Sequence, residues 1–285
     1  MGPPDWGTWT LNRHYLFRGC LIPTRLPFLE KASIIALERM GLEFDLLPDA
    51  TCCMEPIGLR SMALDTWKVT AARMLAIAEV DGRDIVTLCN GCFMSLKEAA
   101  HLLSKDDERE KVNEILADIG MRYEGTTNVK HLLEIVAGMG EERVRSMITS
   151  PLDGLRVAVH PGCHLVRPSR ILGVENPFSP DLLVRVTEWL GAEVVHAQDW
   201  PGCCGGGLTG VNEEISSGIL KETVDEFKMM GAEYIVTPCP FCFIQFDLRQ
   251  KDGLPVIYLG ELLALGLGAS SQDIGIKHHR IRLDL

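Results

Sequence analysis

The stretch YIVTPCPFC at residues 234–242 decides the fold, because a short β-branched run leads straight into a turn that carries two cysteines. The stretch DIVTLCNGC at residues 84–92 has the same form. Runs of this kind are typical of buried strands in parallel sheets. Two matching stretches far apart in one chain indicate an internal duplication.

The duplication extends upstream of both stretches. Each CxxC is preceded by an adjacent pair of cysteines and, further back, by a lone cysteine. The lone cysteine and the pair are separated by 31 residues in the first half and 39 in the second, and the pair and CxxC by 35 and 34. The chain therefore holds two sets of five: Cys20, Cys52, Cys53, Cys89 and Cys92, then Cys163, Cys203, Cys204, Cys239 and Cys242.

Strand and helix patterns alternate between these cysteines. Short apolar runs at 85–86, 157–159, 194–195 and 235–236 predict strands, and longer segments such as 216–230 predict helices. This alternation predicts an α/β fold made of two tandem homologous Rossmann-like repeats with parallel sheets, at residues 11–150 and 151–285. We expect residues from about 105 to 150 to form an extra helical segment, with the boundary at Ser150-Pro151.

The position of the cysteines in this fold predicts one site. In parallel α/β sheets ligands bind beyond the carboxyl ends of the strands, and every cysteine lies at or just after such an end. We therefore expect each set of five thiols to converge at the rim of its own sheet. We also expect the two rims to face each other, so that one active site lies between the two sets.

Composition excludes several classes of function. The chain has 285 residues and a net charge of −11, which argues against a nucleic-acid partner. It shows no secretory signal and no run of about 18 apolar residues, so we expect a cytoplasmic protein without a membrane span. In that compartment thiols stay reduced, and clustered cysteines indicate metal or redox chemistry.

Five thiolates per set favour an iron-sulfur cluster. A structural zinc site takes four ligands and would leave one cysteine idle, although a zinc-binding scaffold stays an alternative. A vicinal disulfide within each adjacent pair is a second alternative, and it is strained and uncommon. No CxxCxxCxxxCP run is present, so the chain lacks the cubane-cluster motif of ferredoxins and needs a partner to supply electrons.

The arrangement closely resembles the B subunit of the heterodisulfide reductase of methanogenic archaea. The motifs that carry the resemblance are LFRGCLIPTRLP in the first half and HPGCH, PGCCGGG and TPCPFC in the second. The resemblance implies that each five-cysteine set ligates one noncubane [4Fe-4S] cluster. It also implies that the chain is the catalytic subunit that reduces the mixed disulfide of coenzyme M and coenzyme B, in the last step of methanogenesis. The implied partners are a ferredoxin-like C subunit, which donates the electrons, and a flavin-containing A subunit.

Basic residues beside the lone cysteines are candidates for substrate contact. Arginine binds sulfonate, phosphate and carboxylate groups through paired hydrogen bonds, and a surface salt bridge is the alternative role for each one. His164 follows Cys163 directly, and we predict that it donates a proton to a product thiolate or a hydrogen bond to a cluster sulfur. His160 is expected only to close its strand. The candidate substrate-binding arginines are Arg18, Arg25, Arg167 and Arg170.

One departure separates the halves. Gly205 follows the second cysteine pair, whereas Met54 follows the first. Glycine permits a positive φ or a close backbone approach, so Met54 predicts a difference in shape or solvent access between the two sites.

Related five-cysteine repeats leave a functional alternative open. The chain would then be the iron-sulfur subunit of an oxidoreductase for glycolate, lactate or glycerol-phosphate, or of another thiol or quinone reductase.

Overall fold

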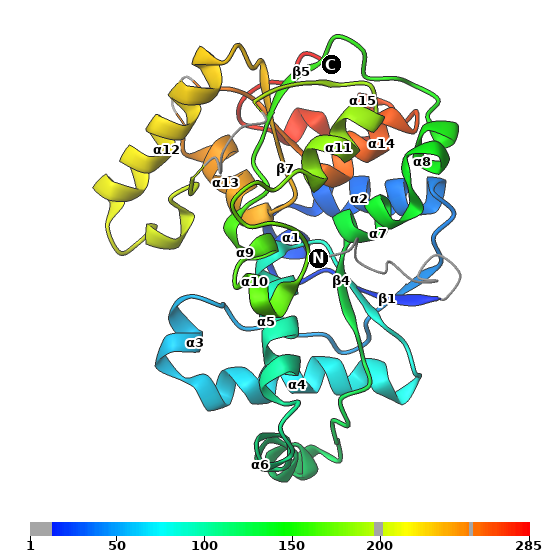
Figure 1. Cartoon of the computed structure of the whole chain (residues 1–285), viewed down its shortest axis with the longest axis vertical. Coiled ribbons are helices and arrows are strands. Elements are labelled where there is room, and N and C mark those ends of the chain that lie inside the picture. The colour runs from blue at the N-terminus through cyan, green and yellow to red at the C-terminus, as the bar shows by residue number, and fades with distance from the viewer. Residues whose placement is uncertain (1–12, 197–201, 251–252) are drawn as a thin grey trace.

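Two four-stranded sheets form the frame of the molecule (Figure 1), a computed structural model that describes residues 13–196, 202–250 and 253–285. The strand orders are β2-β1-β3-β4 and β6-β5-β7-β8, and every pair of neighbouring strands is parallel. The predicted α/β fold with two tandem Rossmann-like repeats is confirmed. The strands are β1 (His14–Phe17), β2 (Phe44–Leu46), β3 (Ile85–Thr87), β4 (Val129–His131), β5 (Arg156–Val159), β6 (Glu193–His196), β7 (Tyr234–Thr237) and β8 (Val256–Tyr258).

Helices connect the strands and cover the sheets. In the first repeat they are α1 (Leu21–Arg25), α2 (Pro27–Arg39), α3 (Gly58–Met62), α4 (Leu64–Val80), α5 (Asn90–Leu102), α6 (Asp106–Leu116), η1 (Ala117–Ile119), α7 (Leu132–Met139) and α8 (Glu141–Met147). In the second they are α9 (Cys163–Val166), α10 (Ser169–Leu172), α11 (Leu182–Trp189), η2 (Gly206–Leu208), α12 (Glu213–Met229), α13 (Pro240–Leu248), α14 (Leu259–Gly266), α15 (Ser271–Ile274) and η3 (Ile276–His278).

The central strands are buried because their sequences are apolar on both faces. β3 reads IVT and is fully buried, and β7 reads YIVT with its last three residues buried. Both end two residues before a cysteine, so the chain leaves the sheet where the CxxC turn begins. The fold thereby delivers the same order of strand, turn and helix to the same end of each sheet.

Residues from about 105 to 150 were predicted to form an extra helical segment. They hold α6, η1, α7 and α8, but they also contain the strand β4. This strand completes the first sheet and matches β8 in the second. Both strands run into a helix through a capping box, in which the backbone N–H of His131 donates to Glu134 (2.8 Å) and that of Tyr258 donates to Glu261 (2.9 Å). The segments HLLE and YLGE are therefore a further part of the duplication.

The two repeats pack closely on each other. Helices α2 and α14 lie side by side (Figure 1), and a Cβ on Gly260 would lie 2.2 Å from Ser33 Oγ. Only glycine permits this approach of the two helices. Arg39 donates to the carbonyl of Leu267 (2.6 Å), and Asn90 Nδ2 donates to the carbonyl of Pro161 (2.7 Å). The predicted boundary at 150–151 falls between α8 and β5 and stays a prediction.

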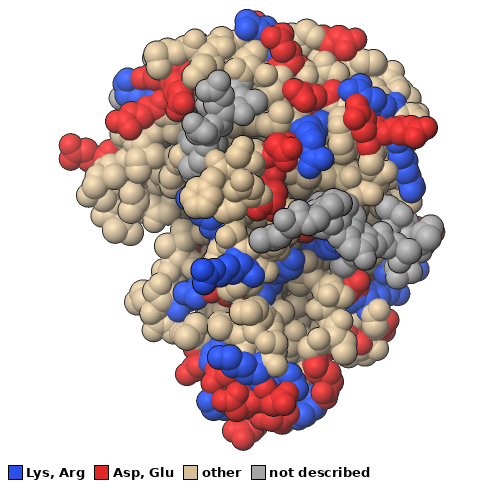
Figure 2. Space-filling model, viewed as in Figure 1, with Lys and Arg blue, Asp and Glu red and all other residues tan. Residues whose placement is uncertain are grey.

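Charged side chains gather over α6 at the lower end of the molecule (Figure 2). The same view shows a hollow on the left, between the lobe that carries α3 and the lobe that carries α12. Across the residues that the structure describes, no helix is long and apolar enough to span a bilayer.

Candidate metal centre

The strand order brings the cysteines of each repeat to the carboxyl end of its sheet. Cys89 and Cys239 are the N-cap residues of α5 and α13, and Cys92 and Cys242 lie in the first turns of these helices. Cys20 precedes α1, and Cys163 begins α9. Sulfur atoms near a helix N-terminus gain from its partial positive charge, which favours thiolates.

All ten cysteines line one cavity of about 190 Å³. Within the first set, the Sγ atoms of Cys20 and Cys52 are 3.5 Å apart, and those of Cys53 and Cys92 are 3.3 Å apart. The ten cysteines all belong to the described part of the chain and all are free thiols. Neither adjacent pair thus forms a vicinal disulfide.

The two sets meet inside this cavity. A hydrogen bond with Cys239 from the second repeat, together with one to Cys92, holds the pKa of the Cys89 thiol well below its ordinary value. Cys89 from the first repeat and Cys239 from the second both line the cavity wall. The prediction that the two sulfur-bearing rims face each other is confirmed.

The electrostatics of the thiols fit a soft metal group. Hydrogen bonding with Cys20, and then with Cys53, lowers the pKa of Cys52, and the same contact with Cys52 is the main cause that raises the pKa of Cys20. Burial, followed by the neighbouring Cys239 and Cys204 sulfurs, raises the pKa of Cys163 to about 11. So many crowded thiols cannot all lose their protons without a compensating positive charge. Several converging thiolates are a ligand set for iron-sulfur clusters or thiophilic metal ions.

Glycine positions next to the cysteines permit close approach. Gly19 has a φ of +69°, and a Cβ there would lie 2.7 Å from Cys92 Sγ. Gly205 has a φ of +78°, and a Cβ there would lie 2.5 Å from the backbone oxygen of Ser216. Met54 occupies the matching place in the first repeat and has a φ of +63°. The backbone therefore has the same left-handed conformation at Met54 and at Gly205. Met54 differs because its Cβ is strained in this conformation and because it carries a side chain.

Two of the predicted basic residues line the cavity. Arg18 and His164 are both on its wall, and Arg18 Nη1 lies 2.6 Å from Glu30 Oε1, which orients the guanidinium group. Arg25, Arg167 and Arg170 are exposed and lie outside the cavity lining. Their role in substrate binding stays a prediction.

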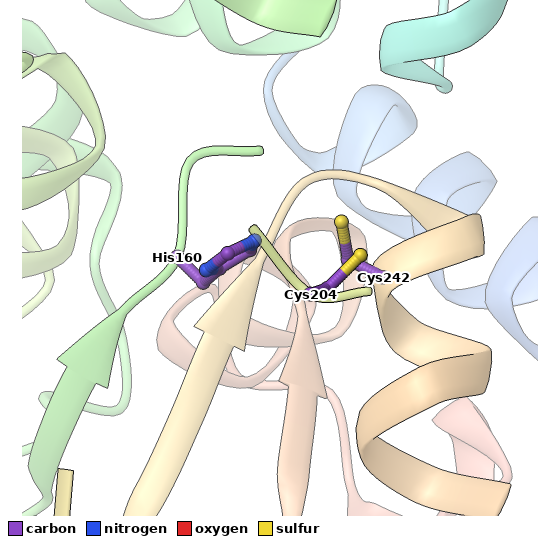
Figure 3. A group of neighbouring side chains, drawn as sticks. All are labelled: His160, Cys204 and Cys242. Atoms are coloured by element: carbon purple, nitrogen blue, oxygen red, sulfur yellow. The ribbon is translucent and has the colours of Figure 1, made fainter. Parts of the chain in front are cut away.

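His160 was predicted only to close its strand, and the structure gives it a further contact. Its backbone N–H does donate to the carbonyl of Val236 (2.8 Å) beyond the end of β5. Its ring, however, lies beside the thiols of Cys204 and Cys242 (Figure 3). The sequence could have identified His160 as the counterpart of Phe17, because each stands three residues before the lone cysteine of its repeat. The direction of the ring could not be predicted in that way.

Tyr258 is a second residue that the sequence did not single out. It is buried, and its hydroxyl donates to the carbonyl of Leu88, the residue before Cys89. This bond joins the second repeat to the turn that carries the first CxxC.

Comparison with known families agrees with the duplication. The model of a cysteine-rich domain, CCG, matches residues 15–97 and again residues 157–247. The two matches contain all ten cysteines.

Three relatives match almost the whole chain. The B subunit of the ferredoxin/F420H2-dependent CoB-CoM heterodisulfide reductase of Methanosarcina acetivorans is 37% identical over 94% of this chain and 93% of its own. A protein of Archaeoglobus profundus, named as similar to the B subunit of heterodisulfide reductase, is 36% identical over 92% and 93%. The 8-methylmenaquinol:fumarate reductase membrane anchor subunit of Wolinella succinogenes is 30% identical over 93% and 95%.

A solved structure supports the fold alone. The crystal structure of a hypothetical protein from Helicobacter pylori superposes with a TM-score of 0.72 at 17% identity. The match covers 99% of this chain and 53% of that one.

Proposed function

The chain belongs to the family of proteins built from two CCG cysteine-rich domains, and on this premise we propose that it is the catalytic subunit of a CoB-CoM heterodisulfide reductase. Its similarity to the B subunits of these enzymes supports an oxidoreductase role. The observation that carries the proposal is the single cavity lined by both five-cysteine sets. A site of this kind suits a two-electron reaction on one substrate.

Each set of five cysteines would hold one [4Fe-4S] cluster of the noncubane type. When bound, the two clusters supply one electron each. The chain contributes the thiolates that hold them and the position of the two groups relative to the substrate. Cys89 and Cys239, each the N-cap residue of the helix that follows its strand, bring the two sets to the same cavity.

The reaction takes up two electrons and two protons. The sulfur–sulfur bond of the mixed disulfide breaks, and coenzyme M and coenzyme B leave as two thiols. His164 is on the cavity wall beside Cys163, where its ring can donate one proton to a product thiolate. The apolar side chains of Ile22, Ile57 and Phe241 also line the cavity and limit the access of water to the breaking bond.

Arg18 is the best placed cation for the anionic groups of the substrate. It lines the cavity and is held by Glu30 while more than a third of its side chain stays exposed. Arg25, Arg167 and Arg170 would act only on parts of the substrate that extend beyond the cavity. Substitution of Arg18 should therefore raise KM more than substitution of any of these three.

The electrons would come from a ferredoxin-like C subunit, within a cytoplasmic complex that includes a flavin-containing A subunit. Exposed apolar side chains next to the cavity support the docking of another polypeptide. Ile57 and Phe241 line the cavity and are 42% and 43% exposed, and Leu59 and Met62 extend this surface along α3.

Metal analysis and turnover test the proposal together. The chain is assembled with iron and sulfide under anaerobic conditions, and we expect about four of each per repeat. The loaded protein should reduce the coenzyme M–coenzyme B disulfide with an artificial one-electron donor. Stoichiometric zinc without iron would overturn the assignment of iron-sulfur clusters. Full cluster content without turnover would overturn the assignment of the heterodisulfide as the substrate.

A second candidate function keeps the metal groups and changes the electron acceptor. It is favoured by relatives named lactate utilization protein A in Macrococcus caseolyticus and Bacillus pumilus, at 28% and 29% identity, and by the fumarate reductase subunit of Wolinella succinogenes. The chain would then be the iron-sulfur subunit of a glycolate, lactate or glycerol-phosphate oxidoreductase, or of another thiol or quinone reductase. Turnover with a quinone analogue but not with the heterodisulfide distinguishes this candidate.

A further inference from the structure

His160 lies against two thiols of the second cysteine set. One of its ring nitrogens and the Sγ atoms of Cys204 and Cys242 all lie within 4.8 Å of one another. Figure 3 shows the imidazole at the end of β5, with Cys204 and Cys242 beside it from two other segments. Three segments that are far apart in the sequence therefore build this contact.

The imidazole is buried without a full set of hydrogen bonds. His160 is 1% exposed, and its ring packs edge-to-face with Phe246 at 5.0 Å between centroids. Within the described residues, its Nδ1 atom has no hydrogen-bond partner. Buried polar groups normally have partners, so a histidine here is unfavourable unless the site gives it one.

The first repeat has a phenylalanine at the equivalent position. Phe17 ends β1 and pairs with Thr87, two residues before Cys89. In the second sheet Val159 pairs with Val236, so the next residue, His160, takes the place of Phe17. Phe17 is likewise 1% exposed. The same place in the frame thus holds a hydrocarbon ring in the first repeat and an imidazole in the second.

We propose that His160 donates a hydrogen bond to the thiolates of Cys204 and Cys242, and that this bond raises the reduction potential at the second cysteine set above that at the first. The inference rests on the proposed function, because it takes the metal group to be an iron-sulfur cluster. One-electron reduction adds negative charge at the ligating sulfurs, and an N–H donor stabilises that charge. Phe17 has no donor to offer.

The consequence is a direction for the electrons. They pass from the group of lower potential to the group of higher potential, so the first set is the side of entry and the second the side of arrival. His160 acts through its neighbours' sulfur atoms and is a positioning residue. Replacing His160 must therefore change the reduction potential at the second cysteine set, whether or not turnover changes.

The test is a redox titration of the cluster-loaded full chain, followed by electron paramagnetic resonance. His160→Phe copies the first repeat, and we expect the potential at the second set to fall. At a fixed applied potential, the ratio of oxidised to reduced cluster at the second set should change by about tenfold. For a one-electron couple this corresponds to a fall of about 59 mV in reduction potential. The potential at the first set should not move. His160→Asn retains a donor and should keep most of the wild-type potential.

The reciprocal variant Phe17→His is the matched control, and it should raise the potential at the first set. Signals are assigned with Cys53→Ser, which removes a first-set ligand and leaves the second set intact. If His160→Phe loses its iron, Phe17→His decides alone: a raised potential supports the inference, and an unchanged one overturns it. Equal shifts at both sets in His160→Phe also overturn it. Absence of iron-sulfur clusters from the wild-type chain would instead refute the proposed function.

Discussion

The two repeats share one strand order and the same places for their CxxC turns, and they differ in side chains at matched positions. Phe17 stands where His160 stands, and Met54 stands where Gly205 stands. The positions that bring sulfur to the cavity are kept in both halves, whereas the positions that shape the environment of the sulfur differ. A duplicated site can therefore hold two similar metal groups and give them unequal properties.

The largest effect is expected from removing one ligand in each half. Cys53→Ser and Cys204→Ser should each lose one of the two clusters and keep about half of the iron, because each set is complete on its own. Turnover of the disulfide should be abolished in both variants, since two electrons are required at once. Iron and sulfide analysis with an activity assay measures this. Loss of all iron from either variant would contradict the idea of two independent sets.

Gly205→Ala should produce the next largest effect. The new Cβ would meet the Ser216 backbone oxygen at 2.5 Å, and φ is +78°. Strain and overlap together should lower the free energy of unfolding by about 3 kcal/mol, measured by anaerobic denaturant unfolding.

Gly210→Ala is the matched control for that measurement. Gly210 has a φ of +82°, but nothing lies within 4 Å of the place that a Cβ would take. This variant should therefore show the backbone cost alone, about 1 kcal/mol. Equal losses for Gly205→Ala and Gly210→Ala would show that the close approach to Ser216 is unimportant.

A smaller effect is expected at the contact between the repeats. Tyr258→Phe removes the donor to the buried Leu88 carbonyl, and we expect a loss of about 1–3 kcal/mol in the free energy of unfolding. Tyr234→Phe is the control, because its hydroxyl bonds the Asp284 carbonyl near the surface (3.2 Å) and should matter by less than about 0.5 kcal/mol. A loss for Tyr258→Phe as small as for the control would mean that the Leu88 carbonyl finds another donor.

The convergence of the cysteines could be predicted from the sequence. Each CxxC follows a β-branched run, and parallel strands must end at one edge of their sheet. The short strand β4 could not be predicted, because VKH carries a lysine at its centre and is only three residues long. Its identity depends on pairing with β3, which is a tertiary contact.

The surroundings of the sulfur atoms were predicted less well. Arg18 and Arg25 flank Cys20 in the sequence, yet only Arg18 lines the cavity, because α1 begins after Cys20 and carries Arg25 to its last turn. Proximity in sequence does not fix the side of a helix on which a residue lies. His160 needed the register of β5 and β7 before its ring could be placed against two thiols.

The smallest effect concerns Met54, where a glycine variant should be more stable than an alanine variant. Both substitutions remove the same half-buried methionine contacts, but alanine keeps a Cβ at a φ of +63° and glycine does not. Relief of left-handed strain, about 1–2 kcal/mol, outweighs the extra chain entropy of glycine, about 0.5–1 kcal/mol. Met54→Gly should therefore exceed Met54→Ala by about 0.5–1 kcal/mol in unfolding free energy. At the exposed helical residue Glu114 in α6 the order should reverse, with alanine the more stable. If Met54 shows the same order as Glu114, left-handed strain does not limit the stability of the first repeat at this position, and the difference between Met54 and Gly205 lies in the side chain alone.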